Sequence, residues 1–113
     1  MYGLILVVAL LGETEREACE RLAPQMNGKT EVLMPDETRC DILTESTAWE
    51  VDWADKWAEG VGQALLYSIW TGKDPGLLLL VKDWRKEKVH ILRAKMVCEK
   101  VGVKFRIDFS DKD

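Results

Sequence analysis

The chain has 113 residues, of which 47% are hydrophobic and 32% are charged. A chain of this length and balance can bury a core of its own, which excludes the disordered, fibrous and disulfide-scaffold classes. Its formal net charge of −4 at pH 7 argues against a protein that holds nucleic acid by overall electrostatics alone. We therefore expect one globular domain over residues 1–113.

The charge is unevenly distributed along the chain. Residues 82–95 contain six Lys or Arg and two acidic residues, so this segment carries +4 and the remainder carries −8. A basic edge beside an acidic region suits a metal site that handles phosphates. It equally suits an ordinary helix whose charged side chains face water, and the sequence leaves both interpretations open.

The N-terminal segment, residues 1–12, raises the question of targeting. Its apolar run, residues 4–11, is eight residues long, which is too short to span a bilayer. No positive residue precedes the run and no A-x-A cleavage pattern follows it. The segment is the start of a hydrophobic strand or helix, an uncleaved anchor, or a degenerate export signal. We expect no stable membrane span and favour a cytoplasmic location, with export through this segment as the alternative.

The three cysteines, Cys19, Cys40 and Cys98, are odd in number and lack C-x-x-C spacing. These features argue against a zinc site or a disulfide framework. We expect buried free thiols in a reducing compartment, and a Cys19–Cys40 bridge is the alternative in an oxidising one.

The first half of the chain predicts a helix followed by three strands. The helix is expected at residues 13–23 and should end at Pro24, ahead of the turn signal Asn27-Gly28. Its expected inward residues are Ala18, Cys19 and Leu22. Three short segments with tight connections then predict an antiparallel meander: residues 30–34, 38–43 and 47–52.

The second half predicts alternating helices and strands. Residues 53–71 have apolar side chains at helical spacing and end at Gly72, a helix-capping residue. These apolar side chains are Trp57, Val61, Ala64, Leu65 and Ile69. Pro75-Gly76 predicts a turn, and the apolar residues 77–81 predict a strand buried on both faces. A helix at residues 87–100, a strand at 103–109 and a charged tail at 110–113 complete the chain.

The expected order of elements is αβββαβαβ. A helix that follows a meander and leads into a buried strand implies a right-handed crossover to a parallel neighbour. The sequence therefore predicts an α/β domain whose mixed sheet, an antiparallel meander plus parallel strands, is flanked by helices.

Three acidic residues in the meander are candidates for chemistry. Residues two apart in a strand share a face, so Glu50 and Asp52 point one way while Trp49 and Val51 point the other. Asp41, on the neighbouring strand, joins them if the meander is in register. Carboxylates crowded in this way repel one another unless a cation neutralises them, and oxygen ligands suit Mg²⁺ or Mn²⁺. The alternative is a set of solvated acids on an exposed sheet face.

The stretch EVDWADKWAEGVGQALLY, residues 50–67, resembles the PD-(D/E)XK nuclease superfamily. It is similar to the RecB-like branch, which has a strand acid, an E-x-K strand and a Q-x-x-x-Y helix. On this resemblance Asp41 is the strand acid and Glu50 is the first residue of E-x-K. Gln63 and Tyr67 form the Q-x-x-x-Y pair. The resemblance covers about residues 13–81 and implies a restriction-endonuclease-like core.

Two further comparisons accompany this resemblance. An acid on the first helix, Glu17 or Glu20, matches the helix glutamate of the resolvase-like branch. The stretch also resembles a group of small proteins with E-x-D in place of E-x-K, whose signature is E-(V/F)-D-(F/W)-A-x-K-W-x-E-(A/G)-(I/V)-G-Q-(A/S)-L-x-Y. That similarity implies no activity.

The chain departs from the superfamily at its catalytic lysine, because Asp52 stands two residues after Glu50. Lys56 lies four residues beyond Asp52, at helical spacing with Gln63, and its long side chain could reach back to the carboxylates. The superfamily tolerates such a migration of the lysine from strand to helix. The alternative is a surface ion pair between Lys56 and Asp52, which contributes only a few tenths of a kcal/mol.

The resemblance implies metal-dependent hydrolysis of a phosphodiester in nucleic acid, with DNA favoured over RNA and Mg²⁺ or Mn²⁺ as cofactor. The implied metal ligands are Asp41, Glu50 and Asp52, and the implied catalytic residues are Asp41, Glu50, Lys56 and Gln63. The candidate substrate-binding residues are Tyr67, Lys82, Arg85 and Lys86. A homodimer is considered because one protomer offers little surface for specificity.

Two other functions compete with a nuclease. A nuclease-like domain without the E-x-K lysine would serve as a binding or structural module. An exported or membrane-tethered interaction protein would use the apolar N-terminus as its address.

Overall fold

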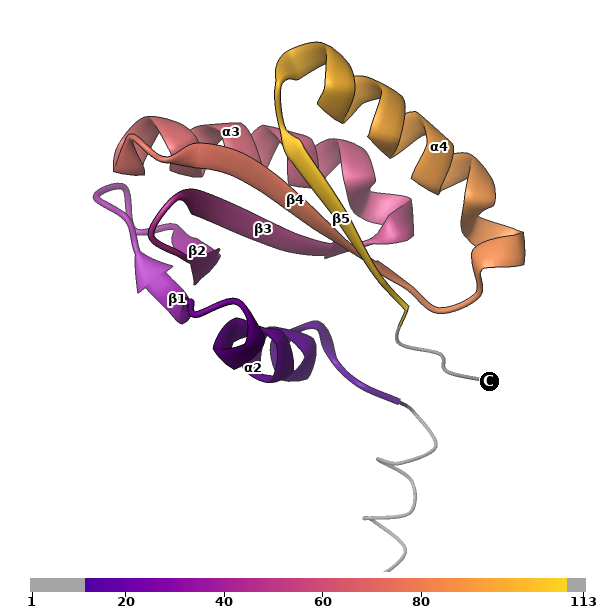
Figure 1. Cartoon of the computed structure of the whole chain (residues 1–113), viewed down its shortest axis with the longest axis horizontal. Coiled ribbons are helices and arrows are strands. Elements are labelled where there is room, and N and C mark those ends of the chain that lie inside the picture. The colour runs from indigo at the N-terminus through magenta and orange to yellow at the C-terminus, as the bar shows by residue number, and fades with distance from the viewer. Residues whose placement is uncertain (1–11, 110–113) are drawn as a thin grey trace, which may run out of the picture.

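The computed structural model describes residues 12–109. The predicted apolar run at 4–11 and the charged tail at 110–113 lie outside the described residues. Figure 1 shows a sheet with α3 and α4 on one face and α2 on the other. The elements are α2 (Glu15–Gln25), β1 (Lys29–Leu33), β2 (Arg39–Leu43), β3 (Thr47–Trp53), the 3₁₀ turn η1 (Ala54–Lys56), α3 (Trp57–Thr71), β4 (Asp74–Val81), α4 (Trp84–Val101) and β5 (Lys104–Phe109). The predicted order is confirmed.

The sheet has five strands in the order β1-β2-β3-β4-β5. The first three strands form the predicted antiparallel meander. β4 runs parallel to both of its neighbours, β3 and β5, through connections that carry α3 and α4. The prediction of a mixed sheet flanked by helices is therefore confirmed.

The core has two layers that meet at β4. Leu77 and Leu79 pack against Val61 and Ala64 of α3, in a cluster that also includes residues of α4. The alternate residues of β4, such as Leu78, face α2 in a second cluster. Side chains alternate across a strand, so a continuous apolar run is what a strand with helices on both faces requires. The predicted burial of residues 77–81 on both faces is confirmed.

Three local predictions are wrong. Pro24 lies inside α2, on its exposed side and one residue before its end. Pro75-Gly76 begins β4 and makes no turn; proline is tolerated at the start of a strand, where few ladder hydrogen bonds are lost. Ile69 is 75% exposed, because it lies two residues after the buried Tyr67 and is rotated to the opposite side of α3. Helix α3 begins four residues later than predicted, and the other boundaries agree with the prediction or differ from it by up to three residues.

Gly76 makes the packing of β4 on β3 sensitive to a single methyl group. It pairs with Trp49, and a Cβ at this position would come within 2.6 Å of the Trp49 ring and 2.8 Å of the Thr47 side chain. We expect Gly76→Ala to lower the free energy of unfolding by about 1–3 kcal/mol, as overpacking of a full core does. Chemical denaturation measures the change.

Gly62 provides the matched control for this substitution. It is exposed within α3, and nothing lies within 4 Å of an added Cβ. Gly62→Ala should raise stability by about 0.5–1 kcal/mol, because alanine loses less backbone entropy in a helix. Equal effects of the two substitutions would contradict the packing at Gly76.

Candidate active site

The site begins where β2 and β3 separate. These strands pair at Ile42 with Trp49 and at Leu43 with Ala48. Beyond this point the backbone N–H of Val51 donates to the carboxylate of Asp41 at 2.8 Å. A side chain thus takes the place of a backbone acceptor, and an acidic group enters the opening between the strands.

A distortion of β1 and β2 accompanies this opening. Glu31 on β1 has φ 49°, a left-handed conformation that is rare for a residue with a side chain. It lies between the pairs Thr30–Ile42 and Val32–Cys40, which keep the same register on both sides of it. Cys40 packs with Tyr67 on the α3 side, whereas Ile42, two residues later, packs with α2. Cys40 and Ile42 therefore face opposite sides of the sheet, so β2 twists sharply at Asp41. Strained backbone such as that of Glu31 is common at functional sites.

Glu50 and Asp52 meet Asp41 at the same place. They are 3% and 4% exposed, and Trp49 and Val51 pack into the opposite layer, as predicted. The carboxyl of Glu50 lies close enough to those of Asp41 and Asp52 for both of them to raise its pKa. The structure therefore brings together all three carboxylates that the sequence singled out.

Burial dominates the electrostatics of these three carboxyls. It raises the pKa of Glu50 far above its ordinary value, and contact with Asp41 and Asp52 raises it further. Burial also raises the pKa of Asp52 to about 6. Burial raises the pKa of Asp41, although the interaction with Glu50 and the hydrogen bond from the Val51 N–H oppose the shift. Within residues 12–109 no Lys or Arg forms an ion pair with any of the three carboxyls.

Helix α3 covers the carboxylates with the predicted Q-x-x-x-Y pair. Its hydrogen-bonding surroundings assign the Gln63 amide with its nitrogen toward Glu50, to whose two oxygens it donates at 2.5 and 3.2 Å. Tyr67 is buried, and burial followed by the charges of Glu50 and Asp41 raises its pKa. The structure therefore brings Gln63 and Tyr67 to the acidic group.

Gly60 allows this close approach of α3 to the sheet. A Cβ on Gly60 would lie 2.8 Å from Leu77 and 3.3 Å from the Asp52 carboxylate. The helix backbone therefore passes directly over Asp52, which fixes the position of Gln63 one turn later.

The acid contributed by α2 is Glu15, and the sequence prediction of Glu17 or Glu20 is corrected. Burial raises the pKa of Glu15 to about 7, and the charges of Asp52 and Asp41 raise it in the same direction. Glu17 closes a capping box with Thr14, and Glu20 is an exposed partner of Arg16 at 3.8 Å. The capping box is the signal that could have identified Glu15, since it places the start of α2 at that residue.

Lys56 lies at the edge of the site. It ends the 3₁₀ turn and is exposed, so the predicted helix from residue 53 is interrupted before α3 begins. Its charge lowers the pKa of both Glu15 and Asp52, so the Lys56 side chain lies near these two carboxyls. Within residues 12–109 it forms no ion pair within 4 Å, so neither the surface pair with Asp52 nor a direct contact with Glu50 is formed.

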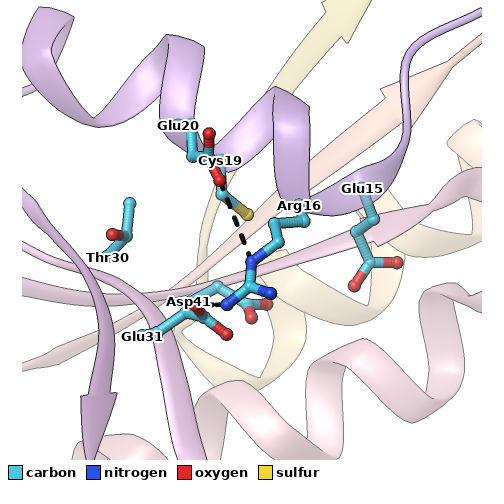
Figure 2. A pocket seen from close by; sticks show the side chains of 7 residues that line it. All are labelled: Glu15, Arg16, Cys19, Glu20, Thr30, Glu31 and Asp41. Carbon is cyan, nitrogen blue, oxygen red and sulfur yellow. Dashed lines mark hydrogen bonds and ion pairs between the residues drawn. The ribbon is translucent and has the colours of Figure 1, made fainter.

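A pocket of about 130 Å³ opens beside Asp41, between α2 and the first two strands. Figure 2 shows Arg16 reaching from α2 toward Glu31 on β1, with the Cys19 sulfur beside it. Arg16 forms ion pairs with Glu31 and Glu20. The pocket is lined by Glu15, Arg16, Cys19, Glu20, Thr30, Glu31 and Asp41. Asp41 is therefore accessible from the α2 side. All three cysteines are free and buried, as expected.

The predicted substrate-binding cations lie around two tryptophans. Lys82 Nζ is 4.5 Å from the centroid of the Trp53 ring, and Arg85 is 5.8 Å from that of Trp84. Trp53 directly follows Asp52 in β3 but points to the opposite face of the sheet, where it packs in the same cluster as Trp49 and Val51. Lys86 is exposed on α4.

A divalent cation is compatible with part of this donor set. Residues 12–109 contain no group of three or more His, Cys, Asp or Glu side chains positioned to hold a metal ion. Mg²⁺, however, keeps several of its waters and needs only one or two carboxylates. Asp41 and Glu50, which lie close enough to shift each other's pKa, supply two carboxyls with hard oxygen donors. The pair therefore fits a hydrated Mg²⁺ or Mn²⁺ better than it fits a fully enclosed ion.

Comparison of the chain with protein-family models, curated proteins and solved structures found no match. None of the described helices is both long enough and apolar enough to cross a membrane.

Proposed function

We propose that the protein hydrolyses phosphodiester bonds in nucleic acid, with Mg²⁺ or Mn²⁺, in the manner of a PD-(D/E)XK nuclease. The observation that carries the proposal is the meeting of Asp41, Glu50 and Asp52 at the opening between β2 and β3. Gln63 and Tyr67 lie directly over them. DNA is the favoured substrate.

Each residue has a role in this proposal. Asp41 and Glu50 hold the cation, and Asp52 with Glu15 extends the negative field around it. When bound, the cation lowers the pKa of a water ligand and neutralises charge that develops on the phosphate. Gln63 orients Glu50 through its two hydrogen bonds, and Lys56 approaches the scissile phosphate from the edge of the site.

The electrostatic cost of the site supports a functional interpretation. Three touching carboxyls in a buried position destabilise the fold, since charged groups lose hydration there and repel one another. Carboxyls with strongly raised pKa values and specific charged neighbours are characteristic of functional sites. Solvated acids on an exposed sheet face, the alternative offered by the sequence, do not account for side chains that are 3% and 4% exposed.

The second candidate is a nuclease-like module that binds without cleaving. The observation in its favour is the position of Lys56, which contacts neither Glu50 nor Asp52 within ion-pair distance in the described part of the chain. A homodimer and a cytoplasmic location stay predictions.

A cleavage assay tests the proposal. We expect the wild-type protein to cut single- or double-stranded DNA in Mg²⁺ or Mn²⁺ and to lose this activity in EDTA. Asp41→Asn should reduce cleavage by about two orders of magnitude or more, because it removes one of two charged ligands. The matched control Glu99→Gln, at an exposed position of α4, should cut normally. A folded wild-type protein that cuts neither form in either metal would favour the binding module.

A further inference from the structure

The outward side of α4 carries an apolar stripe that the described residues do not cover. Val89, Leu92 and Met96 are 50%, 59% and 60% exposed. Their spacing of three and four residues places them next to one another on one side of the helix. The other side of α4, with Ala94 and Cys98, packs into the core. Single exposed apolar residues are ordinary, whereas a continuous stripe is typical of an interaction surface.

Cations flank this stripe on both sides. Helix α4 contains six Lys or Arg and two Glu, so it carries +4 while the rest of the chain carries −8. At 3.6 residues per turn, the cations beside the stripe are Lys88 and Lys95 along one side and Lys86, Arg93 and Lys100 along the other. All five are exposed, and none of them forms an ion pair with another residue in the described part of the chain. An ordinary solvated helix accounts for the cations but not for the apolar stripe between them.

A second copy of the chain does not suit this face. Two α4 helices that faced each other would bring together two surfaces that each carry +4. A stable protein interface buries about 800 Å² on each partner, which three side chains of one helix do not supply. Lysine is also depleted at the core of protein interfaces, since its ammonium is flexible and strongly hydrated. The face therefore suits a partner that needs no fixed shape.

An anionic lipid surface fits both features of the face. Apolar side chains on a helix that lies in the plane of a membrane leave water at the boundary between headgroups and acyl chains. Lysine side chains extend their aliphatic stems along that boundary and place their ammonium groups among the negative headgroups. The backbone of a nucleic acid would meet the cations, but it offers no apolar phase to the stripe between them.

We propose that α4 binds the surface of an anionic membrane, with Val89, Leu92 and Met96 inserted among the headgroups and the flanking cations against the lipid phosphates. The charges orient the protein, because α4 is attracted to a negative surface while the rest of the chain, at −8, is repelled. A helix bound in this way lies on the membrane and does not span it. The inference does not depend on the proposed function, since no residue of the acidic site takes part.

Co-sedimentation with lipid vesicles tests the inference. The full-length protein is mixed with vesicles of phosphatidylcholine alone or of phosphatidylcholine with phosphatidylserine, and the partition coefficient is measured. We expect binding to the phosphatidylserine vesicles that weakens as salt rises, and little binding to phosphatidylcholine alone. Leu92→Glu should weaken binding at least about tenfold, because it removes an apolar side chain and adds a negative charge.

Leu33 provides the matched control. It is 58% exposed, against 59% for Leu92, and it lies on β1, at the edge of the sheet farthest from β5. Helix α4 packs over β4 and β5. Leu33→Glu should therefore bind vesicles as the wild-type protein does. Lys95→Gln should weaken binding about fivefold, the loss of one cation at a negative surface, whereas Lys29→Gln on β1 should not.

Thermal unfolding without lipid shows whether the stripe is open in the free protein. Leu92→Glu should unfold at the wild-type temperature, because the side chain is exposed and glutamate forms helices about as well as leucine. A Tm several degrees lower would show that another part of the chain, such as the apolar run at residues 4–11, covers the stripe. That result would overturn the inference.

Three results with vesicles would also overturn it. Absence of binding to either composition would leave the stripe to a protein partner. Equal binding by wild type and Leu92→Glu would place the membrane contact elsewhere in the chain. Equal binding to the two compositions would remove the role of the cations.

Discussion

Replacing Glu50 with glutamine is expected to stabilise the metal-free protein at pH 8 while it abolishes cleavage. Glu50 is 3% exposed and has a pKa raised by burial and by its two acidic neighbours. A carboxyl whose folded-state pKa exceeds its unfolded value contributes stability below the unfolded pKa and loses it as pH rises. Glutamine keeps the shape, accepts from Gln63, donates to the neighbouring carboxylates and carries no charge. We expect a gain of about 1 kcal/mol or more, or several degrees in Tm.

Thermal unfolding in EDTA from pH 5 to pH 9 measures this effect. The stability of the wild-type protein should fall as pH rises through that range, and the stability of Glu50→Gln should fall less. Glu99→Gln, which removes an exposed acid from α4, should behave as the wild-type protein does. A Glu50→Gln protein that is less stable than wild type at pH 8 would contradict the placement of the carboxyl.

The same variant reports on the metal. A cation that binds only the folded state raises Tm by mass action. Mn²⁺ should therefore raise the Tm of the wild-type protein and leave that of Glu50→Gln unchanged. The shift should grow between pH 6 and pH 8, because protons compete for Asp52 and Glu15, whose pKa values are about 6 and about 7. An equal shift in Glu50→Gln would place the metal elsewhere.

Replacing Lys56 with alanine is expected to reduce cleavage by about two orders of magnitude or more. This is the range lost when a general catalyst or a charge stabiliser is removed. Lys56 is exposed beside Glu15 and Asp52, so its ammonium can turn to a phosphate that is bound at the carboxylates. Initial rates of cleavage under single-turnover conditions measure the loss.

The stability of the Lys56 variants separates catalysis from folding. An exposed lysine contributes little to stability, so Lys56→Ala should unfold at the wild-type temperature. Lys56→Arg keeps the charge but changes the donor geometry, and it should restore activity only in part. Lys100→Ala, an exposed lysine in the last turn of α4, is the matched control. Equal cleavage by wild type and Lys56→Ala would show that the lysine has no role.

The local patterns of the sequence were sufficient to predict the order and arrangement of the helices and strands. The apolar residues 77–81 predicted a strand buried on both faces, and β4 is that strand. The alternation of residues 49–52 placed Glu50 and Asp52 on one face, which the structure confirms. Both predictions depend on the two-residue period of a strand, which the backbone imposes wherever the strand forms.

The geometry of the site depended on the tertiary structure. The sequence analysis did not identify Glu15, although Glu15 shares the inward face of α2 with Ala18, Cys19 and Leu22; only the packing of α2 on the sheet brings it near Asp41 and Asp52. The continuous helix predicted from residue 53 fails because η1 intervenes, and this turn moves Lys56 to the edge of the carboxylates. The site opens because β2 leaves β3 at Asp41, opposite the left-handed Glu31. Periodicity fixes the side of an element on which a residue lies, whereas packing between elements decides which side chains meet, and that depends on contacts distant in sequence.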